Sequence, residues 1–115
     1  MRFRYDPQSG ALYFRLREGK IEETLDLPSP GGYMDVDPEG NVMGLEFLSL
    51  QEYVTFLSGF GGEVELPERV DADAYDEAMR RAFEEVPTGE TPADVLDFFR
   101  ETFLPRTNRE RAGGV

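Results

Sequence analysis

The first 48 residues alternate apolar and polar side chains with a period of two, the pattern of strands that bury one face. The alternation occurs in five short segments, at about residues 2–5, 11–17, 21–27, 33–37 and 42–48. Within each segment a set of apolar residues shares one parity, so each predicted strand has one mainly apolar face. These residues are Phe3, Tyr5, Leu12, Phe14, Leu16, Ile21, Leu25, Leu27, Met34, Val36, Met43, Leu45 and Phe47.

Short turn segments separate the predicted strands. The stretches DPQSG at residues 6–10 and DPEGN at residues 37–41 both combine Asp, a Pro that fixes φ and a Gly that accepts positive φ. EGK at residues 18–20 and PSPGG at residues 28–32 supply the other two connections. Four short connections between five strands predict an antiparallel β-meander.

From residue 49 onward the apolar spacing becomes helical. Ser49 followed by Glu52 has the pattern of a capping box, which predicts a helix start. A second helix is predicted to begin near residue 71 or 73. Its apolar stripe consists of Tyr75, Met79, Ala82, Phe83 and Val86. Thr91 as N-cap and Pro92 at the first helical position predict a third helix, which ends at Pro105.

These elements predict an α+β protein: an antiparallel β-meander of about five strands, followed by three helices packed on one face. Residues 1–105 are predicted to form a single domain, with the meander at 1–48 and the helical part at 49–105. Residues 106–115 have no apolar periodicity, so they are predicted to be a flexible tail.

Composition restricts the chemistry. The chain has no cysteine and no histidine, which excludes disulfides, thiolate metal sites and the commonest general base. The formal net charge is −12, and residues 63–101 carry −9 of it. This charge repels phosphate backbones, so we expect no nucleic-acid binding, and a charged partner would be basic. With no recognisable signal peptide or membrane span, we expect a cytoplasmic protein without membrane binding or a cofactor.

The stretch DVDPEGNVMGLE, residues 35–46, has the ligand spacing of an EF-hand calcium loop. The carboxylates at its ligand positions are those of Asp35, Asp37, Glu39 and Glu46. The preceding LPSPGGYM contains two prolines and two glycines, so no helix can enter the loop. In a hairpin, Glu46 would also lie too far along the returning strand to fold back onto Asp35. The segment is therefore predicted to be a turn, and its carboxylates are only weak candidates for a metal site.

Two groups of residues are candidates for contacts with a partner. Tyr13, Arg15 and Arg17 lie on the polar face of the second predicted strand, a solvent or dimer face. Asp76, Glu77 and Glu84 lie in the acidic helical stretch, which could cover a basic protein. No serine has a histidine to activate it, and no pair of carboxylates is marked as a catalytic cleft, so no catalytic residue is predicted.

The segments YDPQSGALYFRL and YMDVDPEGNVMGLEFL resemble a small bacterial family of unknown function, over about residues 2–48. The matching residues are Tyr5, Asp6, Ala11, Leu12, Tyr13, Asp35, Asp37, Gly40, Gly44 and Glu46. An acidic residue usually precedes the Ala-Leu-Tyr of that pattern, and Gly10 stands there in this chain. The resemblance implies a β-meander and gives no catalytic residues. Some relatives look like partners encoded beside small toxins.

Three functional hypotheses follow. The first is a non-enzymatic module that binds protein, including a second copy of itself, at a sheet edge such as the strand of Phe3. The second is an antitoxin-like inhibitor, in which the acidic helix at residues 71–85 covers a basic RNase-type toxin. The third is a small carboxylate-dependent hydrolase or a calcium-binding protein.

Overall fold

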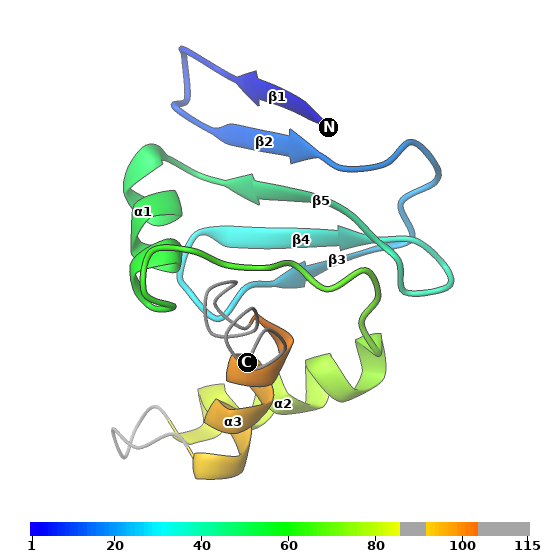
Figure 1. The fold of residues 1–115 in the computed structure, drawn as a ribbon, viewed down its shortest axis with the longest axis vertical. Helices are drawn as coiled ribbons and strands as arrows, with labels where there is room; N and C mark the ends of the chain where they lie inside the picture. The colour runs from blue at the N-terminus through cyan, green and yellow to red at the C-terminus, as the bar shows by residue number, and fades with distance from the viewer. Residues whose placement is uncertain (86–91, 104–115) are drawn as a thin grey trace, which may run out of the picture.

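The computed structural model describes residues 1–85 and 92–103, and these form a five-stranded antiparallel sheet followed by three helices (Figure 1). The strands are β1 (Arg2–Tyr5), β2 (Leu12–Arg15), β3 (Glu23–Asp26), β4 (Gly32–Val36) and β5 (Val42–Phe47). The helices are α1 (Leu50–Ser58), α2 (Ala72–Glu85) and α3 (Ala93–Thr102). The predicted α+β class is confirmed. The predicted tail at residues 106–115 lies outside the described residues, as do residues 104 and 105.

The strands are ordered β1-β2-β5-β4-β3, a meander-like order with one departure from consecutive pairing. Residues 16–22 do not form a hairpin but cross from β2 to the opposite edge of the sheet, and β5 returns to fill the gap between β2 and β4. The physical reason is burial. Five of the six residues of β5 are buried, which suits a central position, whereas all four residues of β1 are exposed, which suits an edge.

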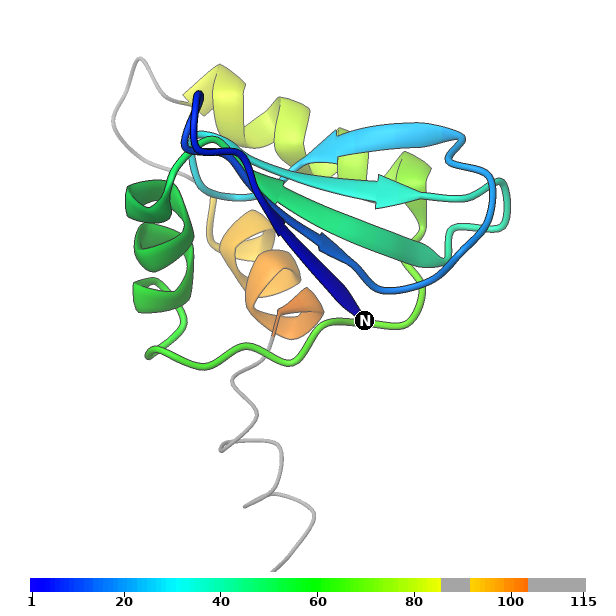
Figure 2. The same ribbon diagram turned by 90° about the horizontal axis from the view of Figure 1, so that it is seen from above.

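The core lies on one side of the sheet and contains residues from all three helices. Phe47 of β5 contacts Phe56 of α1, and Phe56 in turn contacts Phe103, which directly follows α3. Tyr75 of α2 is fully buried and contacts Phe99 of α3 at 5.6 Å between ring centroids. Figure 1 shows that the helices gather on the β3, β4 and β5 part of the sheet, while β1 and β2 extend beyond them. Figure 2 shows α1 and α3 on the same side of the sheet.

The three helices occur where the sequence pattern predicts them, and the differences concern one residue of the apolar stripe of α2 and the N-cap of α3. Ser49 is the N-cap of α1, and its Oγ donates to the carboxylate of Glu52. The stripe predicted for α2 is wrong at Phe83, which is 61% exposed, because the buried stripe is centred on Tyr75, Ala78 and Met79 and Phe83 lies beyond its margin. Val86 and Thr91 lie outside the described residues, and the N-cap of α3 is Pro92. Within residues 1–85 and 92–103, no helix is long and apolar enough to cross a membrane.

Candidate functional site

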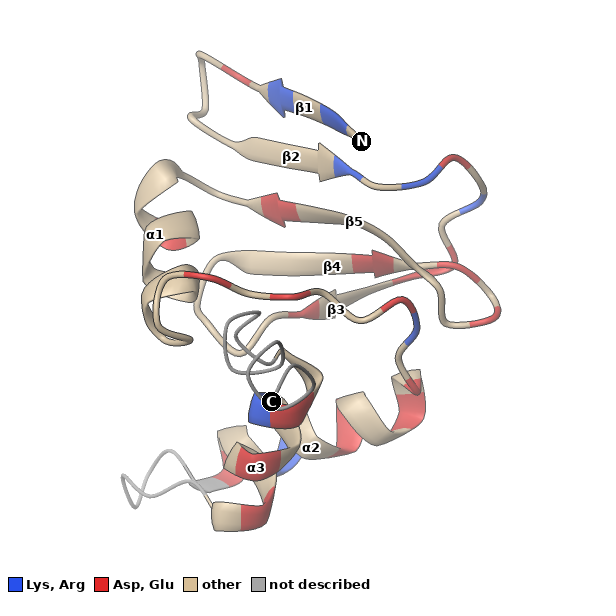
Figure 3. Cartoon of the chain, viewed as in Figure 1, with Lys and Arg blue, Asp and Glu red and all other residues tan. Residues whose placement is uncertain are grey.

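The face of the sheet opposite the helices carries two rows of side chains, each crossing all five strands. Because residues paired across antiparallel strands point to the same face, the rows follow directly from the register. The first row is Arg4, Tyr13, Glu46, Tyr33 and Asp26. The second row is Arg2, Arg15, Gly44, Asp35 and Thr24. Each row is basic at the β1 end and polar or acidic at the β3 end, as Figure 3 shows for the charged residues.

A hydrogen-bond network on this open face links side chains of β2, β3 and β4. The Tyr13 hydroxyl donates to Asp35 Oδ2 at 3.0 Å, and the Thr24 hydroxyl donates to Asp35 Oδ1 at 2.7 Å. The Tyr13 side chain must pass over β5 to reach Asp35, and it does so at Gly44. A Cβ at Gly44 would lie 2.8 Å from the Tyr13 hydroxyl oxygen, so only glycine leaves room for this path.

The network makes a prediction for the Tyr13 phenol. Burial, together with the hydrogen bond and negative charge of Asp35, raises the pKa of Tyr13. A raised pKa in the folded state stabilises the protein fully below the ordinary tyrosine pKa of about 10. That stabilisation is lost as the pH rises through the raised value. We therefore expect Tyr13→Phe to be destabilising at neutral pH, by about 1 kcal/mol for a lost hydrogen bond, and the difference from wild type to shrink at alkaline pH.

Urea unfolding of wild type and Tyr13→Phe, measured from about pH 7 to about pH 11, checks this prediction. Tyr33→Phe is a matched control on the same face, because no side-chain hydrogen bond of Tyr33 is present among the described residues. A difference between wild type and Tyr13→Phe that stays constant with pH would contradict the proposed role of the phenol.

The two arginines predicted as interaction residues have different surroundings. Arg15 is engaged within its own loop, since its guanidinium donates to the carbonyls of Arg17 at 2.6 Å and Gly19 at 2.9 Å. Its side chain is only 18% exposed, so Arg15 holds the loop that leaves β2. Arg17 lies in that loop, beyond the end of the strand, and its positive charge helps to lower the pKa of Asp37. Of the predicted group, Tyr13 is the residue with a contact across the sheet.

The weak metal candidates are divided between a turn and two strands. Asp37 begins the turn between β4 and β5 and accepts hydrogen bonds from the Glu39 backbone and from the backbone and side chain of Asn41, all at 2.9 Å. These bonds, chiefly that of the Asn41 side chain, hold the pKa of Asp37 below its ordinary value. Asp35 and Glu46 lie on the open face of β4 and β5. The turn prediction is confirmed, and no group of three Asp or Glu placed to hold a metal ion occurs within residues 1–85 and 92–103.

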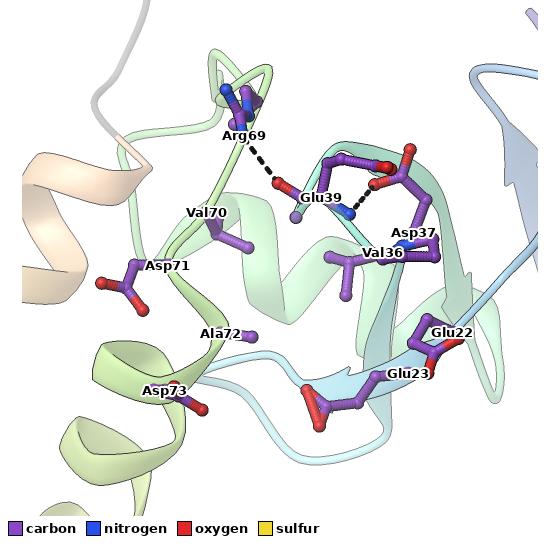
Figure 4. A pocket seen from close by; sticks show the side chains of 12 residues that line it. Glu22, Glu23, Val36, Asp37, Glu39, Arg69, Val70, Asp71, Ala72 and Asp73 are labelled. Atoms are coloured by element: carbon purple, nitrogen blue, oxygen red, sulfur yellow. Dashed lines mark hydrogen bonds between the residues drawn. The ribbon is translucent and has the colours of Figure 1, made fainter.

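A groove of about 680 Å³ lies between the β4–β5 turn and the start of α2 (Figure 4). Its lining includes the carboxylates of Glu22, Glu23, Asp37, Glu39, Asp71 and Asp73. The segment before α2 is held to the turn by the backbone hydrogen bond from the Val70 N–H to the Gly40 carbonyl and by Arg69, which donates to the Glu39 carbonyl at 2.8 Å. Sequence reasoning did not find this groove, because its acids come from three separate segments and no local motif joins them.

The acidic residues of α2 are partly matched by the helix's own arginines. Arg80 pairs with both Glu77 and Glu84, and Arg81 pairs with Asp94 of α3 at 2.6 Å. Asp76 is exposed on the same helix. The predicted partner contacts of Asp76, Glu77 and Glu84 stay a hypothesis, and two of these carboxylates, those of Glu77 and Glu84, are already paired with Arg80.

The two edges of the sheet differ. At the β3 edge, the hydroxyl of buried Tyr75 donates to the Asp26 carbonyl at 2.7 Å, and α2 packs against the strand. At the β1 edge, all four residues are exposed, including Phe3 at 69% and Tyr5 at 60%. On the helix side of β1, an apolar groove of about 330 Å³ continues from Phe3 to α1 and the following segment. Its lining includes Met1, Phe14, Leu16, Leu57, Val64 and Leu66.

Comparison with known protein families gives a match over the sheet. A family model described as "Protein of unknown function (DUF2283)" matches residues 2–50, which contain the five strands and the first residue of α1. The match supports the predicted similarity to a small domain of unknown function over the sheet. No curated protein and no solved structure matches the chain.

Proposed function

We propose that this chain is a non-enzymatic module that binds a second copy of itself through the outer edge of β1. The observation that carries the proposal is the contrast between the two edges. The β3 edge is partly closed by Tyr75 and α2, whereas no strand within residues 1–85 and 92–103 pairs with the outer edge of β1. Unpaired strand edges are templates for pairing with another chain. With one edge available per copy, pairing of like edges gives a closed dimer instead of a filament.

The apolar side of β1 supports the same function. Phe3 packs edge-on against Phe14 at 5.2 Å between centroids, yet most of its surface remains exposed. Single exposed apolar residues are ordinary, but here Phe3 continues into the apolar groove described above. A strand added at β1 would cover this surface.

The charge of β1 favours a second copy as the occupant. Most of the molecule is acidic, whereas Arg2 and Arg4 make β1 basic (Figure 3). The strand is followed at once by Asp6, so an antiparallel copy brings a carboxylate to the basic end of β1. Because β1 has only four residues, the paired surface is small, and we expect a weak, concentration-dependent dimer.

Sedimentation velocity of wild type from about 1 μM to about 1 mM tests the proposal, and a shift from monomer to dimer is expected. Phe3→Lys places a charge in the apolar surface beside the edge. It should raise the protein concentration at the midpoint of the monomer–dimer transition by at least about tenfold. Phe83→Lys is the matched control, because Phe83 is similarly exposed at 61% but lies on α2. A monomer at every concentration, or equal weakening by both variants, would overturn the proposal.

A further inference from the structure

We infer that two copies pair β1 with β1 in one register, with Arg4 opposite Arg4 on a two-fold axis perpendicular to the sheet. This inference rests on the proposed function, because it specifies how the second copy is seated. The result would be a continuous sheet of ten strands, five from each copy.

The backbone of β1 limits the possible registers. The Asp6 N–H donates to the Ala11 carbonyl at 2.9 Å, so the backbone groups of Asp6 face β2. Antiparallel ladders alternate, and therefore the N–H and C=O groups of Phe3 and Tyr5 face away from β2. A symmetric partner strand that hydrogen-bonds to these groups can be centred on Phe3, on Arg4 or on Tyr5.

Two of these registers are unfavourable. A pairing centred on Phe3 sets Arg2 opposite Arg4 twice, and like charges directly opposite each other are destabilising. A pairing centred on Tyr5 sets Phe3 opposite Pro7 of the second copy, and proline has no N–H to donate to the ladder.

The register centred on Arg4 gives most of the side chains a favourable partner in the second copy. On the open face, Arg2 lies opposite Asp6 of the second copy, and this pairing of opposite charges occurs twice. On the helix side, Phe3 lies opposite Tyr5 of the second copy, also twice, and aromatic pairs across strands are stabilising. The one unfavourable contact is between the two Arg4 residues at the axis.

The surroundings of β1 reduce that cost and extend the aromatic contacts. The Arg4 guanidinium lies over the Tyr13 ring of the same subunit, 5.9 Å from the ring centroid. This attraction draws the guanidinium away from the Arg4 of the second copy. On the helix side, Phe14 stacks on Tyr53 at 5.3 Å and meets Phe3 at 5.2 Å. The second copy's Tyr5 would continue this row and cover the exposed ring of Phe3.

The absence of cysteine allows a direct test of the register. Arg4 would face its copy as a non-hydrogen-bonded pair, with Cα atoms about 4.5 Å apart, and a disulfide needs about 4.4–6.8 Å. Under the mild oxidant diamide, Arg4→Cys should therefore give a covalent dimer, at least about ten times faster than Phe3→Cys or Tyr5→Cys. In this register the last two cysteines lie beyond the about 7 Å limit from their own copies. Phe83→Cys measures cross-linking by random collision.

The outcomes separate the register from the proposed function. If wild type dimerises and Arg4→Cys cross-links fastest, both stand. If wild type dimerises but Phe3→Cys or Tyr5→Cys is fastest, the register is overturned and pairing through β1 stands. If no β1 cysteine exceeds Phe83→Cys although wild type dimerises, pairing through β1 is overturned. A wild type that stays monomeric overturns both.

Discussion

Replacing Phe47 with alanine is expected to lower the free energy of unfolding by about 3–5 kcal/mol. The side chain is fully buried on the central strand β5, and its ring contacts Phe14 of β2 as well as Tyr53 and Phe56 of α1. Truncation removes these contacts and leaves a cavity between sheet and helix that neither element can readily close. A domain of this size has about 5–15 kcal/mol of total stability, so the variant should be close to unfolding at 37 °C.

Urea unfolding followed by far-ultraviolet circular dichroism measures the change. Phe83→Ala is the matched control, because the same atoms are removed from a ring that is 61% exposed, and it should cost less than about 1 kcal/mol. Equal losses for the two variants would contradict the assignment of Phe47 to the centre of the core.

The second large effect is expected at Gly40. Gly40 and Gly10 both follow an Asp-Pro turn, and both have φ of +83°. A Cβ at Gly10 meets nothing within 4 Å, whereas a Cβ at Gly40 would overlap the carbonyl oxygen of Val70. Gly10→Ala should therefore cost only the backbone strain of a positive φ, about 1–2 kcal/mol. Gly40→Ala should cost the same strain plus about 1–3 kcal/mol, because the segment before α2 must move.

Thermal or urea unfolding of the two variants gives both values, and their difference isolates the contact between Gly40 and Val70. The same displacement should break the backbone hydrogen bond from the Val70 N–H to the Gly40 carbonyl, 2.9 Å in the native protein. Loss of this hydrogen bond should appear as faster hydrogen exchange of the Val70 amide in Gly40→Ala, with no change in Gly10→Ala. Identical stabilities for the two variants would show that the 68–70 segment does not lie against the turn.

Local features of the sequence predicted the elements well. The parity of Leu25, Met34, Leu45 and Phe47 located strands that bury one face, since a shift by one residue would send these side chains to the open face. The Asp-Pro turn signals located the hairpins β1–β2 and β4–β5, because Asp6 and Asp37 accept hydrogen bonds from the backbone of their own turns. Both kinds of signal act over a few residues, which is why they can be read from the chain.

The site residues were only partly predictable. Tyr13, Asp35 and Glu46 were singled out by sequence reasoning, but Thr24 was not, and Gly44 appeared only as part of a motif. Thr24 and Asp35 are 11 residues apart, and Tyr13 and Asp35 are 22 apart. Thr24 and Asp35 are neighbours across the β3–β4 pair, so their bond follows from the strand register. No local pattern marks the pair of Tyr13 and Asp35, since these two residues meet only when β5 is inserted between β2 and β4.

The sequence by itself determined which segments are extended or helical, which face of each strand is apolar, and that neither histidine nor cysteine chemistry is available. The tertiary structure alone decided the order of the strands, and with it which edge is left open. The physical reason is competition for burial over the whole chain. The apolar β5 takes the centre, α2 covers β3, and β1 is left with its edge and its aromatic side chains exposed.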